Sequence, residues 1–482
     1  MIDKEIKEID LTDYYVVLGS GLSAVSTIHG IHDSQGSAGK KIIVIDAGLT
    51  EESNPTFTKM NNNYKSPSPK FKIKANQYVY KSFKSMLDVT EEGFEVVGSL
   101  AKGGLSNIWG AGIQPYTDKE LFKFPYTFDE IKHIYSKIYK ILTGSKNKIF
   151  LDSKVNNRNF VISDPLLAIN KKWKNLNNCH LKTCNDGCIS CNKNIFNSKY
   201  EIDDLIKLDK IEYLPGLFIE SISWEGDHYI IKCLEIISEK IIFIKASVIY
   251  SSLGPVSTSK IVLEMTGKKD NLPLLSTPGG SLFIFSLKDF HKGNHSILSS
   301  KTFTGNLNAH SFEGNIFPFS ENLVSTYFGN SIGKVLNYLF RNLIFSKLFI
   351  ANVYFDSDMS QSRIKYEDKN LKIESTTTAK LKKIFKSALV IIKKEFLIRG
   401  LLVIPFSYKL LLPGQDIHYG GTIPMKKNPK KNQCNFNGQL QGFKNFYITD
   451  ASALPYLAAK GQSFNSMVNA YYIASKSVSA EE

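Results

Sequence analysis

The sequence has 482 residues, of which 43% are hydrophobic and 22% charged, values that are ordinary for a globular protein with a substantial core. Its formal net charge is +15, but no dense block of Lys and Arg interleaved with aromatic residues accompanies that charge. We therefore interpret the charge as a solvated surface, expect no nucleic-acid partner, and expect two or three domain-sized units.

Neither a secretion signal nor a membrane span is expected. The opening residues, MIDKEIKEIDLTD, are charged, and no uninterrupted apolar stretch reaches about 18 residues. We therefore expect a cytoplasmic protein. Residues 333–355 are apolar with interspersed Lys and Arg, and we favour a buried helix that runs into a strand. The alternative is contact with the inner face of a membrane.

The first element in the chain is a strand–turn–helix–strand unit. An apolar run at residues 15–18 stops at Gly19, and a second apolar run occupies residues 42–45. Gly19 permits a tight turn, Gly21 lets the backbone approach a pyrophosphate, and Ala24 is small enough for close helix packing. This G-x-G-x-x-A pattern predicts a dinucleotide site, the alternative being a tight turn whose glycines only permit packing.

Asp46 ends the second strand, where a carboxylate can accept hydrogen bonds from the ribose diol of an adenosine. The same carboxylate would repel a 2′-phosphate, so NADP is disfavoured. The motif does not by itself distinguish FAD from NAD.

Further elements follow in chain order. Residues 127–142 form an amphipathic helical pattern, with Thr127 and Glu130 placed as a capping box. Short apolar runs between residues 213 and 250 predict strands. Residues 376–400 predict a long basic amphipathic helix, and a closing helix is expected from about Asn465.

This order predicts an α/β fold with an α+β substrate domain, in which a discontinuous dinucleotide fold is joined to an antiparallel-sheet domain. The dinucleotide-binding domain comprises residues 1–125, 205–285 and 410–482. The substrate domain comprises residues 286–409, and a helical and cysteine-rich insertion comprises residues 126–204.

Four more segments, together with the first turn, resemble the glucose–methanol–choline oxidoreductase family. They are KGGLSNIWGAG (102–112), GPVSTSKIVLEMTG (254–267), DIHYGGTIPM (416–425) and NFYITDASALPYLAAKGQSFNSMVNAYYIA (445–474). The likeness covers about half of the chain in blocks spread from end to end. It implies that FAD lies extended through the dinucleotide domain and that a substrate alcohol is oxidised against the flavin.

The resemblance also implies which residues contact the cofactor. Gly19, Gly21, Ala24 and Asp46 match the pyrophosphate turn and the ribose acid. Gly-rich segments expose backbone N–H groups to oxygens of the cofactor. The remaining matches are Gly103, Gly104, Ser106, Asn107, Asp450 and Ala451. Asp450 resembles the carboxylate that bonds the ribityl chain, its alternative being a turn or capping Asp. Some relatives carry a His that links covalently to the flavin where this chain has Ile108, which implies non-covalent FAD.

A catalytic pair is implied by the same likeness. His418 lies where the family has a base that faces the flavin, and a largely neutral imidazole suits removal of the hydroxyl proton. Hydride then passes to flavin N5. Asn465 matches the second residue, which can orient the hydroxyl without titrating. It also opens the closing helix, whose N-terminus would favour negative charge on reduced flavin. The alternative for His418 is a half-buried loop histidine with a structural hydrogen bond.

The four clustered cysteines are Cys179, Cys184, Cys188 and Cys191. Their spacing in one short loop is closer to ferredoxin-like runs than to two separated zinc knuckles. Some sugar dehydrogenases that resemble this family carry a C-x-x-G-C … I-F-N-S insert thought to hold an Fe–S cluster, and this chain has matching residues. Three alternatives stay open: an Fe–S cluster, zinc, and thiols without metal.

Together these features predict an FAD-dependent alcohol oxidoreductase, most simply a dehydrogenase that acts on a sugar or polyol. Its partners would be a small-molecule or glycan-like alcohol and an electron acceptor, either a small molecule or a protein. The competing interpretations are an oxidase that passes electrons to O₂, and a catalytically silent binding protein that keeps only the flavoprotein scaffold.

Overall fold

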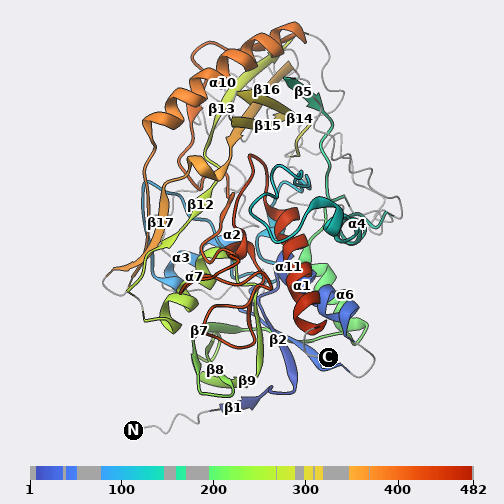
Figure 1. Cartoon of the computed structure of the whole chain (residues 1–482), viewed down its shortest axis with the longest axis vertical. Helices are drawn as coiled ribbons and strands as arrows, with labels where there is room; N and C mark the ends of the chain where they lie inside the picture. The colour runs from blue at the N-terminus through green and yellow to red at the C-terminus, as the bar shows by residue number, and fades with distance from the viewer. Residues whose placement is uncertain are drawn as a thin grey trace.

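Figure 1 shows the computed structural model of the chain. It describes residues 7–35, 39–50, 77–145, 159–169, 195–267, 269–287, 298–307, 310–318, 347–367 and 370–479. The predicted metal-binding cysteines, all within residues 179–191, lie outside the described residues. Most of the apolar segment 333–355 lies outside them as well.

A five-stranded parallel sheet forms the centre of the lower part of the molecule in Figure 1. In sheet order its strands are β22 (Phe446–Ile448), β10 (Val248–Ser251), β2 (Tyr14–Leu18), β3 (Lys41–Ile45) and β6 (Glu212–Leu214). The strands come from the beginning, middle and end of the chain, so the domain they form is discontinuous. Strands β2, β3 and β10 are buried along nearly their whole length, as expected for parallel strands covered on both faces.

Helices pack around this sheet and position its loops. They are α1 (Leu22–Ser34), α4 (Phe128–Thr143), α6 (Ser198–Lys207), α7 (Pro255–Met265) and α11 (Ser463–Ser479). Helix α4 begins at the predicted capping box, in which Thr127 and Glu130 each bond the other's backbone N–H. Helices α1 and α11 lie side by side (Figure 1) and are in extensive contact, which brings the two ends of the chain together.

A second sheet lies below the parallel one. It joins β1 (Lys7–Asp10) to the antiparallel strands β9 (Ile241–Ala246), β8 (Tyr229–Glu235) and β7 (Leu217–Trp224).

The upper part of Figure 1 is a seven-stranded sheet covered by one long helix. Its strands are β19 (Leu401–Val403), β13 (Gly279–Ser286), β16 (Leu348–Phe355), β15 (His310–Pro318), β14 (Lys301–Leu307) and β5 (Phe160–Ser163), with β20 (Lys409–Leu410) also pairing β13. Every pairing is antiparallel. Helix α10 (Ala379–Ile398), the predicted basic helix, packs its apolar side on alternate residues of these strands.

Smaller elements connect the two parts. A third sheet contains β11 (Leu272–Pro273), β17 (Ser362–Glu367), β18 (Asn370–Ser375) and β4 (Val89–Glu92), and β12 (Leu275–Ser276) pairs β21 (Tyr419–Gly420). Short helices are α2 (Gln77–Tyr80), α3 (Phe83–Leu87), η3 (Gly104–Asn107), η6 (Ser357–Met359) and η7 (Ala451–Ala453). Strands β4 and β5 each pair with strands from a different predicted domain, so hydrogen bonding crosses the predicted boundaries.

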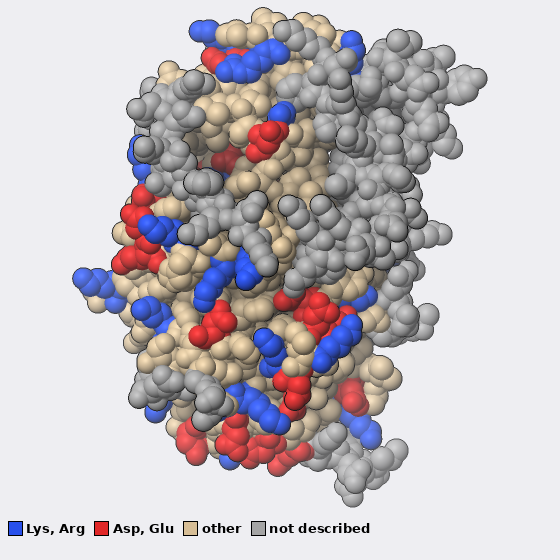
Figure 2. Space-filling model, turned by 90° about the vertical axis from the view of Figure 1, so that its right-hand side faces the viewer, with Lys and Arg blue, Asp and Glu red and all other residues tan. Residues whose placement is uncertain are grey.

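The predicted fold class, an α/β domain joined to an antiparallel-sheet domain, is confirmed by this architecture. Lys, Arg, Asp and Glu are interspersed over the described part of the face in Figure 2, consistent with a solvated charged surface. Among the described helices, none is long and apolar enough to cross a membrane.

Close packing of α1 on α11 gives a first prediction. A Cβ added at Gly30 of α1 would lie 2.8 Å from the carbonyl oxygen of Tyr471 and 3.0 Å from Cβ of Ala474. We expect Gly30→Ala to destabilise the protein, because overpacking costs about 1–3 kcal/mol and exceeds the gain in helix propensity of up to about 1 kcal/mol.

The urea midpoint measures this effect, with Gly112→Ala as the matched control. A Cβ at Gly112 meets no atom within 4 Å, so the control should leave the midpoint nearly unchanged. Equal midpoints for both variants would contradict the packing described for α1 and α11.

Candidate functional site

A cavity opens at the carboxyl ends of the parallel strands. This edge of an open α/β sheet is where ligands of such folds bind, because the strand-to-helix turns meet there. Segments that are far apart in the sequence line it, among them the turn after β2, the turn after β10 and the segment before α11. Residues that line it include Gly19, Gly21, Asp46, Gly104, Ser106, Gly254, Asp450, Ala451 and Gln462.

The first glycine turn has the geometry that the sequence predicts. Gly19 has a φ of +92°, and a Cβ there would lie 2.8 Å from the carbonyl oxygen of Ser252. A side chain at Gly19 would therefore be strained and would clash with backbone. A Cβ at Gly21 would meet no protein atom within 4 Å, because it would project into the cavity. Ala24 is fully buried in α1.

Three helices begin at this cavity, namely α1, α7 and α11. None of the three carries an acidic residue in its first turn, and neither α1 nor α7 has a side chain that caps its N-terminus. Unpaired N–H groups and the positive dipole ends of the helices favour an anion there. Together with the space beside Gly21, these termini fit the pyrophosphate of a dinucleotide.

Asp46 follows β3 and lies at the wall of the cavity, 7% exposed. Its Oδ2 accepts hydrogen bonds from the hydroxyls of Ser20 and Tyr213, the latter at 3.1 Å. Burial raises the pKa of Asp46 to about 6, although these hydrogen bonds favour the ionised form. The carboxylate is therefore positioned by its neighbours and faces the space where a ribose would lie.

The second glycine segment packs against the first. A Cβ at Gly104 would lie 3.3 Å from Cα of Gly21, and the backbone N–H of Gly103 donates to Ser20 Oγ at 2.9 Å. The side chains of Ser106 and Asn107 bond within the segment and to its neighbour Asn197. These two side chains therefore shape the loop, and the segment lines the cavity with Gly104, Leu105 and Ser106.

Asp450 lies at the base of the cavity after β22. Its carboxylate accepts from the N–H of Gly254 at 2.8 Å, the hydroxyl of Thr258 at 2.5 Å and the N–H of Ser452 at 2.7 Å. Burial raises the pKa of Asp450, and these three donors oppose the rise. Asp450 thus fixes the start of α7 and also caps η7, while Ala451 beside it lines the cavity. Asp450 therefore has the capping role that the sequence left open as an alternative, and its predicted contact with the cofactor stays a prediction.

His418 lies just beyond the cavity, between its lining residues Ile417 and Tyr419. Its side chain is 22% exposed, and Nδ1 lies 3.2 Å from Asp416 Oδ2, though not aligned as a hydrogen bond. The Nε2 atom faces Gly461, where an added Cβ would lie 3.5 Å away. The ring edge packs on Tyr354 of β16, with centroids 5.2 Å apart. His418 therefore stands between the cavity and the seven-stranded sheet.

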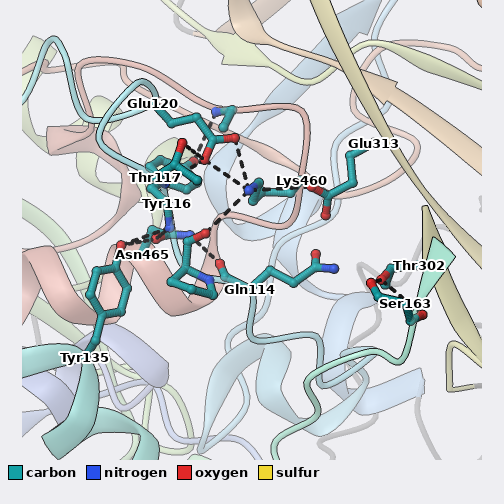
Figure 3. A network of polar contacts seen from close by, with 12 residues as sticks. Gln114, Tyr116, Thr117, Glu120, Tyr135, Ser163, Thr302, Glu313, Lys460 and Asn465 are labelled. Atoms are coloured by element: carbon teal, nitrogen blue, oxygen red, sulfur yellow. Dashed lines mark hydrogen bonds and ion pairs between the residues drawn. The ribbon is translucent and has the colours of Figure 1, made fainter. Parts of the chain in front are cut away.

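Asn465 is buried and bonded to structural partners (Figure 3). Its Oδ1 accepts from the N–H of Tyr116 at 2.9 Å and the hydroxyl of Tyr135 at 2.5 Å, and its Nδ2 donates to the carbonyl of Gln114 at 3.0 Å. Asn465 therefore fixes the segment before α4 against α11. The second hydrogen of its Nδ2 is not used in these bonds, and the predicted catalytic role of Asn465 stays a prediction.

Gln462 is a site residue that the sequence interpretation missed. It is 8% exposed and lines the cavity, and its Nε2 donates to the carbonyls of Ile417 and Tyr419 on either side of His418. Its Oε1 has no hydrogen-bond partner among the described residues. A buried acceptor without a partner is costly, which indicates that a ligand completes it. The feature of the sequence that could have identified Gln462 is its position directly before the closing helix.

A buried ionic cluster lies next to this position (Figure 3). The Nζ of Lys460 is 3.0 Å from Glu120 and 3.5 Å from Oε2 of Glu313 on β15. Burial favours the neutral amine, but the two carboxylates outweigh it and raise the pKa of Lys460. Burial also raises the pKa of Glu313 to about 7. We name these three residues the Lys460 cluster, and it joins the parallel-sheet domain to the seven-stranded sheet.

The described residues contain no group of three or more His, Cys, Asp or Glu side chains placed to hold a metal ion. Cys233 and Cys434, the two cysteines within the described ranges, are buried and unpaired. The prediction for the cluster of four cysteines is therefore not tested by the structure.

Comparison with known proteins shows the fold. No family model and no curated protein matches the sequence. Solved structures match over nearly the whole chain at low identity. Pyridoxine 4-oxidase from Mesorbium loti has a TM-score of 0.62 at 12% identity, covering 96% of this chain and 99% of that one.

A formate oxidase has a TM-score of 0.66 at 12% identity, covering 99% of each chain. A variant of the formate oxidase from Aspergillus oryzae RIB40, in which the effect of a mutation on FAD modification was examined, has a TM-score of 0.67 at 12% identity and covers 99% of each chain. The chain therefore has the fold of glucose–methanol–choline oxidoreductases, as the sequence motifs predicted.

The Lys460 cluster gives a prediction for stability. Lys460→Met should destabilise the protein by about 3–5 kcal/mol, because it leaves the half-buried carboxylate of Glu120 and the buried carboxylate of Glu313 without their cation. Folded Glu313 holds its proton to about pH 7, above the pH at which an unfolded glutamate loses it, so stability falls as pH rises through that window. Lys460 opposes this rise in the pKa of Glu313, so its removal raises that pKa further, and the loss in the variant should be larger at pH 8 than at pH 5.

Urea unfolding at both pH values measures the effect, and Lys132→Met is the control. Lys132 pairs with Asp129 on the exposed side of α4, where an ion pair contributes about 1 kcal/mol or less. Similar losses in the two variants, or a loss that is independent of pH, would contradict the ionic character of the cluster.

Proposed function

We propose that the protein is an FAD-dependent oxidoreductase that oxidises an alcohol group of a sugar or polyol-like substrate, with His418 as the base. The observation that carries this proposal is the position of His418 just beyond a cavity that is bordered by three helix N-termini and a buried acid. The fold shared with FAD-associated oxidases supports the same reaction class.

The residues around the cavity fit FAD. Gly21, Gly104 and the start of α1 would hold the pyrophosphate, and Asp46 would accept the ribose hydroxyls. Bound FAD supplies the acceptor for a hydride from the alcohol carbon. Ile108 is buried in a small apolar cluster and offers no atom for a covalent link, which supports non-covalent binding.

The residues of the chain would prepare the alcohol for oxidation. Because Nδ1 of His418 lies against Asp416, Nε2 is the nitrogen left to accept the hydroxyl proton. Asp416 is nearly buried and holds Thr277 by a 2.9 Å hydrogen bond, so its carboxylate is fixed where it stabilises the protonated imidazole. The free Oε1 of Gln462, and the remaining amide hydrogen of Asn465, are available to orient the substrate.

The electron acceptor has two candidates. Three similar structures are oxidases, which favours O₂. The cysteine cluster favours a dehydrogenase, since an Fe–S centre would carry single electrons to another acceptor. We propose that the cluster binds iron, with zinc or free thiols as the other outcomes of elemental analysis, and that the protein works in the cytoplasm. The silent-scaffold interpretation does not explain why the buried Oε1 of Gln462, beside His418, has no hydrogen-bond partner among the described residues.

Non-covalent FAD gives a direct prediction. Acid precipitation of the yellow protein should release the flavin into the supernatant, because no bond to the chain holds it. Absorbance of the supernatant and the pellet measures the partition. Flavin that stays with the pellet would show a covalent link, and a protein that binds no flavin would refute the cofactor.

The base gives a second prediction. His418→Ala should keep FAD bound, while anaerobic flavin reduction by the substrate slows by about 10²–10⁴-fold, the usual contribution of general-base catalysis. Stopped-flow absorbance measures this step separately from reoxidation. His133→Ala, which removes an exposed histidine of α4, should leave the rate unchanged. An unaltered rate in flavin-loaded His418→Ala would place the base elsewhere.

A further inference from the structure

Helix α10 presents a strongly basic side to solvent. Its apolar side packs on the seven-stranded sheet, and its six lysines are all exposed. Residues 376–415 contain eight Lys and Arg but one acid, Glu395, which pairs with Arg399 at 2.7 Å. In Figure 1 the helix lies along the upper edge of the molecule, on the outer side of the sheet. The exposed side of α10 is therefore cationic.

Exposed apolar side chains gather around the C-terminal half of this helix. In the part of the chain that the structure describes, twelve large apolar side chains are exposed, and seven of them lie between residues 390 and 412. Val390 and Leu397 are seven positions apart and so lie on one side of α10, and Ile398 is exposed beside Leu397. Single exposed apolar residues are ordinary, whereas such a concentration marks an interaction site.

The loop after β19 presents the most exposed of these seven side chains. Phe406 is 94% exposed and has a φ of +61°, a backbone conformation that is unfavourable for a bulky residue. The loop is fixed by Ser407, whose hydroxyl donates to the carbonyl of Ile404 at 2.8 Å and accepts from the N–H of Phe283 at 3.1 Å. Gly or Asn would adopt this conformation more easily, so packing within the protein does not account for a phenylalanine there.

This loop and α10 form one surface. The Nζ of Lys393 lies 5.0 Å from the ring centroid of Tyr408, which places the loop beside the exposed side of the helix. Lysine stems lie along apolar surface while their ammonium groups stay in water, so charged and apolar side chains share this surface. We name it the α10 patch, and it consists of the six lysines of α10 with Val390, Leu397, Ile398, Phe406 and Tyr408.

The α10 patch is separate from the candidate active site. Alternate residues of β16 point to opposite faces of the sheet. Val353 and Phe355 pack with α10 in one core, whereas the ring of Tyr354 packs against His418. Helix α10 and His418 therefore lie on opposite faces of the sheet, and contacts of the α10 patch are independent of the proposed oxidation.

We propose that the α10 patch docks the protein on an anionic membrane surface. Clusters of about four to eight Lys and Arg on an amphipathic helix attract anionic lipid head groups. Exposed Phe and Leu side chains beside such a cluster insert into the interface between head groups and acyl chains. The protruding Phe406 suits a fluid lipid layer, because a folded acidic protein would need a pocket shaped to receive it.

Sedimentation with vesicles measures the docking of the purified protein. One set of vesicles contains phosphatidylcholine alone, and the other contains about one third phosphatidylglycerol. We expect binding to the anionic vesicles to be at least about tenfold stronger than binding to the neutral ones. Raising NaCl from about 0.1 M to about 0.5 M should weaken it, because salt screens the charges.

Phe406→Ser tests the apolar part of the patch. It should weaken binding to anionic vesicles by about tenfold, because it removes a side chain that the lipid would bury. The control is Ile237→Ser, a similar change at an exposed position on the turn between β8 and β9, at the opposite end of the molecule in Figure 1. The control should alter binding by less than about twofold.

The double variant Lys393→Glu/Lys394→Glu tests the charge, and it decides the matter if Phe406→Ser does not fold. It should weaken binding to anionic vesicles by about tenfold or more. Lys426→Glu/Lys427→Glu reverses another adjacent and exposed pair, so it changes the net charge equally outside the patch. This control should weaken binding by less than about threefold, because charges beyond the contact are screened.

Equal losses in the patch variants and their controls would overturn the proposal. Equal binding to neutral and anionic vesicles, or no binding to either, would overturn it as well. Retention of the protein on immobilised polyglutamate without binding to vesicles would overturn it in favour of an acidic protein partner.

Discussion

The candidate cofactor site depends on three helix N-termini and one buried acid, Asp46, which meet at the carboxyl edge of the parallel sheet. Strands β2, β3 and β10 are adjacent, so the turns that follow them meet at one edge. Helix dipoles alone would favour any anion in the cavity, and Asp46 restricts which groups of a ligand can lie beside it. The acid disfavours a phosphate at its own position and favours hydroxyls, so the cavity suits the pyrophosphate that we propose at the helix termini and the ribose that we propose beside Asp46.

A second constraint acts where the two domains meet. The Lys460 cluster and the Asn465 hydrogen bonds place several polar groups in this buried junction. Such groups need partners, and the protein supplies some through Tyr116, Tyr135 and Tyr354. The groups left over, on Gln462 and Glu313, both lie near His418 or the sheet that faces it. The polar groups that have no partner at the domain junction therefore lie close to the candidate catalytic residue.

Local signals in the sequence predicted much of this structure. Gly19 adopts a positive φ of +92° in the tight turn that the local sequence predicts, and the Thr127 capping box was complete within four residues. Long-range pairing could not be predicted in this way. Strands β4 and β5 join sheets built from residues far along the chain, and nothing in their short sequences specifies the partner.

In the candidate site, too, local sequence signals were predictable and long-range contacts were not. Asn465 matched a family position by spacing, yet its side chain is held by Tyr116 and Tyr135, residues more than three hundred positions away. Gln462 faces the cavity because α11 begins at Ser463, a boundary that the sequence placed two residues later. One helical residue rotates a side chain by about 100°, so small errors in a helix start decide which residue faces a site.

The most direct test of the account is a fluorescence titration of the cofactor-free protein with FAD, riboflavin and NAD⁺. FAD should bind stoichiometrically at micromolar protein. Riboflavin, which lacks the pyrophosphate and adenosine, should bind at least about a hundredfold more weakly, because it cannot use the helix termini or Asp46. Binding of NAD⁺ as tight as that of FAD, or riboflavin binding equal to that of FAD, would contradict the central role given to this cavity.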